Sequence, residues 1–481
     1  MDVGAELDEL RAALAALDSV LAAKDARIAE LEEKLARVAE LEAELGKLRE
    51  LLGRNSSNSN KPPSSDGPGL GPRKPKKKGK RRRGAQKGHR GSHRALVAPE
   101  QVDQVVDVYP PECTSCWERL PAIPDAFAKR YQLTELKPLA VHVTEYRRHA
   151  VVCPCCGHKT RAAYDPEVIP RLSFGPRLMA VVAMLTGVYH LSRRQTVRLL
   201  RELVGVRLSL GSVSSIEARM SEMLEPVADE ALEYARGGAI KHADGTSWVR
   251  AGATLSLWVL ATAAVTVFKV LNNGRAETLR NDLFGRVRGI LVSDRATALK
   301  FWAMRRRQVC WAHLTRKFVS FSERDGPAGT IGKELLEYTS LLFEYWSSFR
   351  QKRMSRATLI AFMAPVRREI ERLLAAAVAA KRPGLSGSCE DILAHREALW
   401  TFVEHTGVEP TNNHAERELR GFVLWRRRSF GSQSERGDRF AERVMTVVHT
   451  ARKQGLDVLA LLEACCARRE DAPVPSLLAA A

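Results

Sequence analysis

The sequence lacks the features that mark membrane and exported proteins. Its longest stretch without a charged residue is 251–268, which is rich in Thr, Ala and Val and holds few Leu. Because a transmembrane helix usually needs about 20 strongly apolar residues, this stretch is better interpreted as two strands of a sheet. The first ten residues carry acidic side chains where a signal peptide has a basic region and an apolar core. We therefore expect no membrane partner and a cytoplasmic protein.

Acidic residues are also few, with 56 Asp and Glu against 76 Lys and Arg, a formal net charge of +20 and a pI near 9.8. Such an excess predicts an anionic partner, either nucleic acid or a membrane surface. Residues 73–94 contain no acid at all. Within the flexible linker expected at 53–104, this run is interpreted as an arm that grips DNA phosphates, the alternative being a solvated tail. The basic side chains proposed for this contact are Lys76, Lys77, Lys78, Lys80, Arg81, Arg82 and Arg83.

A disulfide framework is not expected, because most of the nine cysteines are clustered in a chain without export features. Residues 105–170 carry two Cys-x-x-Cys pairs, a spacing typical of one tetrahedral Zn²⁺ site. The proposed zinc ligands are Cys113, Cys116, Cys153 and Cys156. Two alternatives stay open: Cys155 could replace a neighbour, and His158 could act as a substitute ligand. A redox pair is disfavoured, because no βαβ pattern surrounds either motif.

Leucines repeat every seven residues in segment 1–52, and a second series follows three residues after each of them, interrupted by Lys24. After Val38 the spacing contracts, as in a three-residue stammer. Sustained heptads flanked by charged residues predict a coiled coil and self-association. The alternative is a helix that folds back on its own domain.

Residues 171–236 are expected to be helical, with one helix at 191–204 and a second at 212–222 in the proportions of a helix-turn-helix. Arg193 and Arg194 on its first helix are candidate DNA contacts, although helical hairpins of this size are also common packing units. Residues 237–323 predict three successive strands, a helix, a fourth strand and a fifth strand followed by a helix. This is the ribonuclease-H-like order, in which the first and fourth strands end side by side. Asp244 and Asp294 fall at those two expected ends.

A third carboxylate, Glu416, lies on the helix predicted within 406–430. Asn413 and Arg420 share its face at helical spacing, and Arg417 adds another phosphate-binding group. The competing interpretation is a capping box, in which the Asn413 side chain caps the helix and the Glu416 side chain bonds back to the backbone N–H of Asn413.

Several sequence motifs occur in a specific order: the leucine-rich coil, GRNSSNSNKPPSSD, the basic arm, the paired Cys-x-x-Cys module, HADGTSW, VSD, CWAHLTRKF, TNNHAERELR and WRRRSFGSQSERGDRF. In this order the sequence closely resembles the TnpC-type transposases of the IS66 family of bacterial insertion sequences. The resemblance implies that Asp244, Asp294 and Glu416 form a DDE acidic triad. It also implies the four zinc ligands named above.

This resemblance implies a multidomain α+β enzyme that cleaves the ends of its insertion sequence and joins the 3′ ends to target DNA. Two Mg²⁺ or Mn²⁺ ions would serve at the triad and one Zn²⁺ would be structural. The implied partners are terminal and target DNA on the bacterial nucleoid, a second copy of the chain, and small accessory proteins. The rival functions are a catalytically dead DNA-binding regulator and a ribonuclease-H-like nuclease.

Two positions depart from the family pattern: Gly245 stands where an acidic or polar residue is usual, and no aromatic residue follows Asp294 within 295–298. Residues 324–405 are rich in helix formers and are expected as a helical insertion in the core, followed later by a C-terminal helical segment at 431–481. Just beyond the fifth strand, three further side chains are candidate DNA contacts or part of a solvated basic helix: His313, Arg316 and Lys317.

Overall fold

The computed structural model describes residues 3–59, 95–163, 173–468 and 472–478. The chain has a mixed α+β architecture and divides into two compact units. Unit 1 comprises 1–72, 164–196 and 210–481, and unit 2 comprises 73–163 and 197–209. The proposed basic arm at 73–94 lies outside the described residues. No helix in the described ranges is long and apolar enough to cross a membrane.

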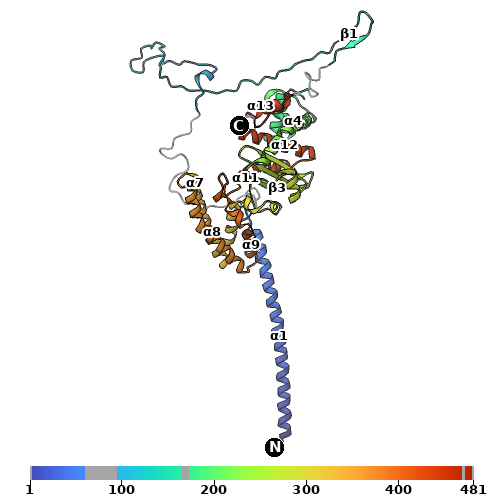
Figure 1. Cartoon of the computed structure of the whole chain (residues 1–481), viewed down its shortest axis with the longest axis vertical. Coiled ribbons are helices and arrows are strands. Elements are labelled where there is room, and N and C mark those ends of the chain that lie inside the picture. Colours follow the sequence, from blue (N-terminus) through green and yellow to red (C-terminus); the bar gives the residue numbers. More distant parts are fainter. Residues whose placement is uncertain (1–2, 60–94, 164–172, 469–471, 479–481) are drawn as a thin grey trace. The chain divides into compact units, whose positions relative to one another are not determined.

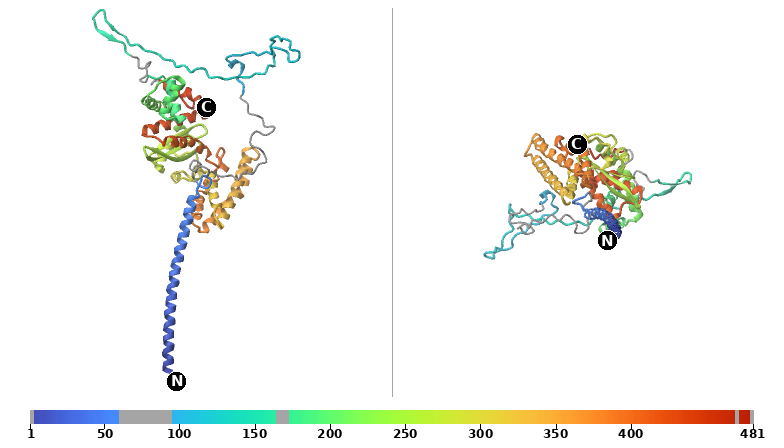
Figure 2. Two further views of the ribbon diagram at one scale, coloured as in Figure 1. Left: turned by 180° about the vertical axis from the view of Figure 1, so that it is seen from behind. Right: turned by 90° about the horizontal axis from the view of Figure 1, so that it is seen from below.

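Helix α1 (Val3–Leu52) is continuous over 50 residues and passes through the expected stammer without a break (Figures 1 and 2). At about 1.5 Å per residue it is about 75 Å long. Every side chain of α1 whose burial is described is exposed, and the heptad residues Leu14 and Leu35 are 64% and 76% exposed. The apolar stripe predicted from the heptads is therefore present and uncovered on the single chain.

Residues 53–59 form a hydrogen-bonded turn, which differs from the featureless linker expected there. Asn58 accepts a hydrogen bond from the backbone N–H of Asn55 through its side-chain oxygen (2.8 Å), and its amide donates to the Gly53 carbonyl (3.0 Å). The same amide donates to Glu323 at 2.8 Å. Asn side chains bond readily to nearby backbone, so this polar stretch orders itself without burying apolar surface.

In unit 2, residues 95–163 contain little regular structure, whereas residues 197–204 belong to helix α3 (Arg193–Val204). Residues 95–163 have a 3₁₀ turn (η2, Pro99–Gln101) and one antiparallel hairpin, β1 (Ala150–Val152) with β2 (Lys159–Arg161). Large apolar side chains, among them Phe127 and Leu133, are more than four-fifths exposed. Residues 95–163 therefore do not build a hydrophobic core by themselves.

The helical region comprises α2 (Pro176–Ala183), the π-helical turn η3 (Met184–Val188), α3 (Arg193–Val204) and α4 (Leu210–Gly237). The second helix was expected to end near Glu222, as in a helix-turn-helix, but α4 continues through Pro226 to 28 residues. Its extra length is explained by burial: Leu224, Val227 and Ala231 are fully buried beyond the expected end. Helix α4 is thus a core element of unit 1.

A five-stranded mixed sheet forms the centre of unit 1 (Figure 1). Its strands are β3 (Ile240–Arg250), β4 (Ala253–Ala261), β5 (Thr266–Leu271), β6 (Ile290–Ser293) and β7 (Arg307–Val309). The order across the sheet is β5-β4-β3-β6-β7. Strands β3, β4 and β5 pair antiparallel, whereas β6 lies parallel to β3 and β7 parallel to β6. The first and fourth strands are therefore neighbours, in the order that the sequence pattern predicts.

Short turns connect the strands, and helices follow the last of them. Between β5 and β7 lie α5 (Ala276–Thr278), η4 (Leu279–Phe284), η5 (Thr297–Leu299) and η6 (Met304–Arg306). After β7 come α6 (Trp311–Ser322), α7 (Pro327–Arg350), α8 (Arg356–Ala379), α9 (Ser386–Ala394), η7 (Arg396–Leu399) and α10 (Thr401–Glu404). The stretch expected as an insertion at 324–405 is thus helical.

Helices α6 to α9 pack in sequence against one another and share one hydrophobic core with strands β6 and β7. The indole N–H of Trp311 and the side-chain amide of Gln308 both donate to the Leu399 carbonyl, at 2.7 and 3.1 Å. Gln308 also accepts from the backbone N–H of Phe402 at 2.8 Å. The end of the insertion is therefore fastened to the sheet edge at β7.

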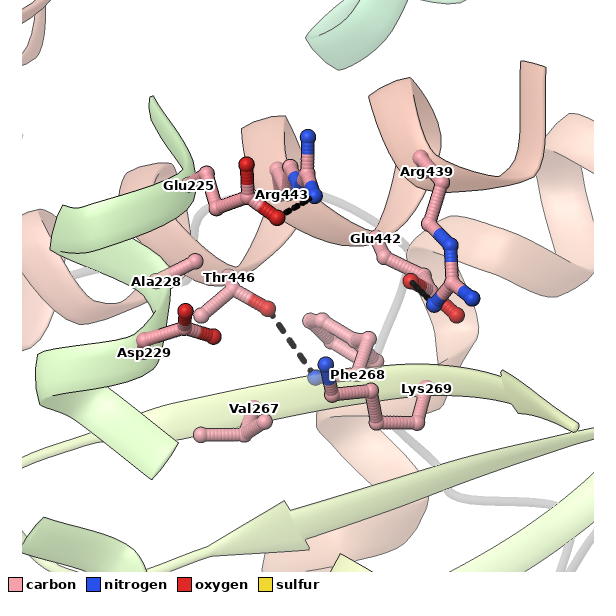
Figure 3. A pocket seen from close by; sticks show the side chains of 10 residues that line it. All are labelled: Glu225, Ala228, Asp229, Val267, Phe268, Lys269, Arg439, Glu442, Arg443 and Thr446. Atoms are coloured by element: carbon pink, nitrogen blue, oxygen red, sulfur yellow. Dashed lines mark hydrogen bonds and ion pairs between the residues drawn. The ribbon is translucent and has the colours of Figure 1, made fainter. Parts of the chain in front are cut away.

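The C-terminal helices are α11 (Asn413–Ser429), α12 (Glu435–Lys453) and α13 (Val458–Ala467). Helix α12 runs along the edge strand β5 and supplies acceptors for its outward N–H groups. Thr446 accepts from the backbone N–H of Phe268 at 3.0 Å (Figure 3). Thr450 accepts from Thr266 at 3.0 Å, and Glu442 accepts from Val270. Side chains four apart on a helix lie on one face, so one helix satisfies alternate amides of the strand.

Candidate active site

Asp244 and Asp294 lie on neighbouring parallel strands. Strand β3 pairs with β6 over residues 240–242, so Asp244 comes just past this pairing, and Asp294 directly follows β6. The sequence pattern placed Asp244 at the end of its strand, but β3 continues to Arg250 because its second half pairs with β4 alone. The two carboxylates nevertheless start from adjacent positions in the sheet.

Glu416 lies in the first turn of α11, and the residue before that helix fixes its position. The buried Asn412 donates through its side-chain amide to the Ala243 carbonyl (2.8 Å), and its backbone N–H donates to the Cys310 sulfur (3.1 Å). No side chain caps the N-terminus of α11. The capping-box interpretation of Asn413 and Glu416 is therefore wrong: Asn412 ties the helix to β3 and to the start of α6 instead.

Burial and neighbouring negative charge raise the pKa of Asp244 to about 7. The main cause is loss of solvent, and the next two are the charges of Asp294 and Glu416. Like charges in one buried place resist ionisation unless a cation joins them, and carboxylate oxygens are the ligands that Mg²⁺ prefers. Asp244 is therefore electrostatically coupled to the other two predicted carboxylates, although the ligand atoms of these three residues do not all lie within 4.8 Å of one another in the described part of the chain.

Two residues of α6 flank Glu416. The Nδ1 atom of His313 lies 3.5 Å from one carboxylate oxygen of Glu416, and a guanidinium nitrogen of Arg316 lies 3.6 Å from the other. Burial lowers the pKa of His313 despite the opposing charge of Glu416. Both side chains were predicted as DNA contacts, and both lie beside the carboxylate group.

Arg307, a fully buried residue of β7, was missed by sequence reasoning. Its guanidinium donates to the Asp294 carbonyl at 2.9 Å and to the Ser293 hydroxyl at 3.3 Å. Arg295, the residue after Asp294, forms an ion pair with Asp391 of α9 at 2.6 Å. The insertion and β7 therefore hold the backbone around Asp294. A single arginine in a short strand gives no sequence signal of such a role, so Arg307 could not be predicted.

The departure at Gly245 has a structural explanation. Gly245 lies opposite Trp258 in the β3–β4 register, and a Cβ atom at this position would meet the indole ring at 2.7 Å. A side chain here requires the buried Trp258 to move. Only glycine fits beside Trp258 at this position without moving the indole ring. The departure from the family pattern does not change Asp244 itself.

The other predicted DNA contacts are spread over several elements. On α11, Asn413, Arg417 and Arg420 are exposed on the outer face. Arg194 is exposed on α3. Arg193 instead forms an ion pair with Glu217 of α4 at 2.5 Å, so the charge of Arg193 is neutralised within the fold. The Lys317 ammonium lies 5.3 Å from the ring centre of Phe321. The structure thus brings His313 and Arg316 of α6 to Glu416, whereas Arg193 is engaged elsewhere in the fold.

Each Cys-x-x-Cys pair forms a tight knuckle. The Cys113 and Cys153 N–H groups donate to the Glu118 and His158 carbonyls, at 2.8 and 2.9 Å. Backbone N–H groups of the residues that follow lower the pKa of both thiols, with Cys116 and Cys156 the first causes. Among the described residues, however, the four sulfur atoms do not gather into one group. The structure therefore contains two separate Cys-x-x-Cys knuckles, and their sulfur atoms are too far apart to bind one ion together.

Comparison with known proteins identifies the family. Residues 171–439, more than half of the chain, match the profile described as "Transposase IS66 family", and residues 3–95 match a family of unknown function (DUF6444). A curated relative, the uncharacterized protein y4qI of Sinorhizobium fredii, is 26% identical over 290 residues. The match covers 53% of this chain and 52% of that protein, so the chain spans about half the length of this relative. From the profile match over the region that carries the carboxylate group, the chain belongs to the IS66 family of transposases.

Proposed function

We propose that this protein is a DDE transposase that cleaves the ends of its insertion sequence and joins the 3′ ends to target DNA. The observation that supports the proposal is that the charges of Asp294, which follows β6, and of Glu416 on α11 both raise the pKa of Asp244 on β3. The strand order β5-β4-β3-β6-β7 supports a ribonuclease-H-like core for these residues. Family membership adds the class of reaction.

Two bound Mg²⁺ ions would supply the Lewis acidity that phosphodiester cleavage needs at neutral pH. The protein's own residues position the groups around them. Asn412 and Arg307 fix the backbone beside Glu416 and Asp294. The exposed Arg417 and Arg420 on α11 are proposed to bind phosphates of the DNA next to the site.

The N-terminal segments are proposed to bring two DNA ends together and to add affinity for DNA. The exposed leucine stripe of α1 would associate with a second copy of the chain, so that two cores can act on two ends. The arm at 73–94, with its run of Lys and Arg, would add affinity for DNA without sequence preference. Small accessory proteins of the same element are proposed as further partners.

A structural Zn²⁺ is proposed for the knuckles at Cys113, Cys116, Cys153 and Cys156. Both knuckles point backbone N–H groups at a thiol and so favour the thiolate that zinc binds. Residues 95–163 bury few of their large apolar side chains. Small modules without a core commonly fold on a metal, so binding would bring the two knuckles together.

The test is a cleavage and strand-transfer assay on DNA that carries the element's ends, with Mg²⁺ or Mn²⁺. Asp244→Asn, Asp294→Asn and Glu416→Gln each remove one charge and keep the shape of the side chain. Because each charge is needed to hold the cation, we expect each variant to lose cleavage and joining while DNA binding persists.

Glu337→Gln, an exposed carboxylate on α7, is the matched control and should retain parental rates. Parental turnover in any of the three variants would show that the carboxylates are not the catalytic group. Cleavage without joined products in the parent would favour the nuclease alternative, and DNA binding without cleavage would favour the regulator.

A further inference from the structure

A second group of metal-ligating side chains also includes Glu416. The ligand atoms of Cys310, His313 and Glu416 all lie within 4.8 Å of one another. No other set of three such residues comes as close in the part of the chain that the structure describes. Cys310 precedes the first residue of α6 and is fully buried, His313 follows in the first turn, and Glu416 faces them from α11.

Two atoms of this group have no hydrogen-bond partner. The Nδ1 atom of His313 and the Oε1 atom of Glu416 are buried and face one another at 3.5 Å, yet neither has a hydrogen-bond partner among the described residues. Buried polar atoms are rarely left in this state. A cation between the imidazole nitrogen, the carboxylate oxygen and the neighbouring sulfur would satisfy both unpartnered atoms at once.

The donor set indicates which kind of cation fits. Sulfur and imidazole nitrogen select transition metals such as Zn²⁺, whereas Mg²⁺ takes oxygen ligands. Three protein ligands also leave one position of a tetrahedral ion open. The group therefore differs in chemistry from the three carboxylates, although the two share Glu416.

We propose that Cys310, His313 and Glu416 bind one Zn²⁺-class ion, separate from the knuckle zinc and from the catalytic ions. Glu416 would turn Oε1 toward this ion, while Oε2 lies beside Arg316. The ion would fasten α6 to α11 and so fix the orientation of a catalytic carboxylate. Its binding does not depend on the proposed DNA chemistry.

The test measures zinc in the full-length protein after chelation and reloading with Zn²⁺ alone. Cys310→Ser and His313→Gln should each bind one zinc fewer per chain than the parent, because each removes a ligand and leaves the knuckles intact. Cys389→Ser removes an equally buried thiol on α9 and should bind as much zinc as the parent. Loading with Co²⁺ gives a second measurement, since thiolate–cobalt absorption should fall in Cys310→Ser but not in Cys389→Ser.

Equal zinc content in the parent, Cys310→Ser and His313→Gln would overturn the proposal. A folding failure of Cys310→Ser is recognised by its circular dichroism, and His313→Gln then decides the question. Cleavage that is lost in Asp244→Asn while zinc binding is unchanged would show that the two sites are independent. Zinc loss in His313→Gln in a protein that never cleaves DNA would support this site and reject the catalytic proposal.

Discussion

At the scale of single residues, Asp244 is a carboxylate whose ionisation costs the metal-free fold stability. Its pKa rises from 3.8 to about 7 on folding, so the unfolded chain ionises first as the pH increases. The resulting loss of stability is absent below about pH 4, grows by about 1.4 kcal/mol per pH unit, and levels off above about pH 7.

Asp244→Asn should therefore stabilise the metal-free protein at pH 8 and have little effect near pH 4. Thermal unfolding in chelator across this pH range measures the difference. Adding Mg²⁺ should reverse the order at pH 8, because only the parent gains a bound cation. A stability difference that does not vary with pH would contradict the coupled-carboxylate site.

Glu418 shows how far helical spacing alone can distinguish a candidate metal ligand from a neighbouring carboxylate. Two positions after Glu416 on a helix, it points away from that residue, as expected. The structure adds that Glu418 is held by His449 at 2.5 Å and by Lys453 at 3.3 Å, both on α12, and these partners lower its pKa to about 2 despite burial. Glu418 therefore forms structural ion pairs between α11 and α12, and its substitution would be expected to change stability.

At the scale of elements, helix α12 and strand β5 depend on each other. The strand lies at the sheet edge, and the hydroxyl of Thr446 accepts the N–H of Phe268. Thr446→Val keeps the volume but leaves that buried N–H without an acceptor, which costs about 1–3 kcal/mol. We expect a lower unfolding temperature and faster hydrogen exchange in β5.

Thr446→Ser keeps the hydroxyl and is the control; it should exchange like the parent in β5. Unchanged exchange in Thr446→Val would mean that the hydrogen bond is not the link between the strand and the helix.

The order of the elements could be predicted from the sequence because alternating and helical apolar patterns depend on local spacing. The strand order and the helical nature of 324–405 follow from such patterns. Element lengths could not be predicted in the same way, because tertiary partners set them: β3 continues along β4, and α4 continues along the core. The three carboxylates were proposed from strand ends, helix spacing and family resemblance, whereas Arg307 acts through backbone contacts that no motif encodes.

At the scale of the whole molecule, α1 is the segment proposed to set the number of chains in the assembly. Leu21→Glu with Ile28→Glu places charge on the heptad seam and should convert the protein to monomers. Lys24→Leu completes the second apolar series and should strengthen association. Sedimentation equilibrium over a concentration range measures both effects. A parent that is monomeric at every concentration would contradict the proposed coiled coil.

The dependence of β5 on α12 also has a consequence during synthesis of the chain. The ribosome makes β5 long before α12, so the outward amides of Thr266, Phe268 and Val270 have no acceptors from α12 until nearly all of the protein has been translated. Until then the nascent sheet presents an apolar open edge, the kind of surface that pairs with other chains. A gene copy with a stop codon or frameshift before α12 should therefore yield aggregated protein, so such damage would not leave a soluble fragment that carries Asp244, Asp294 and Glu416.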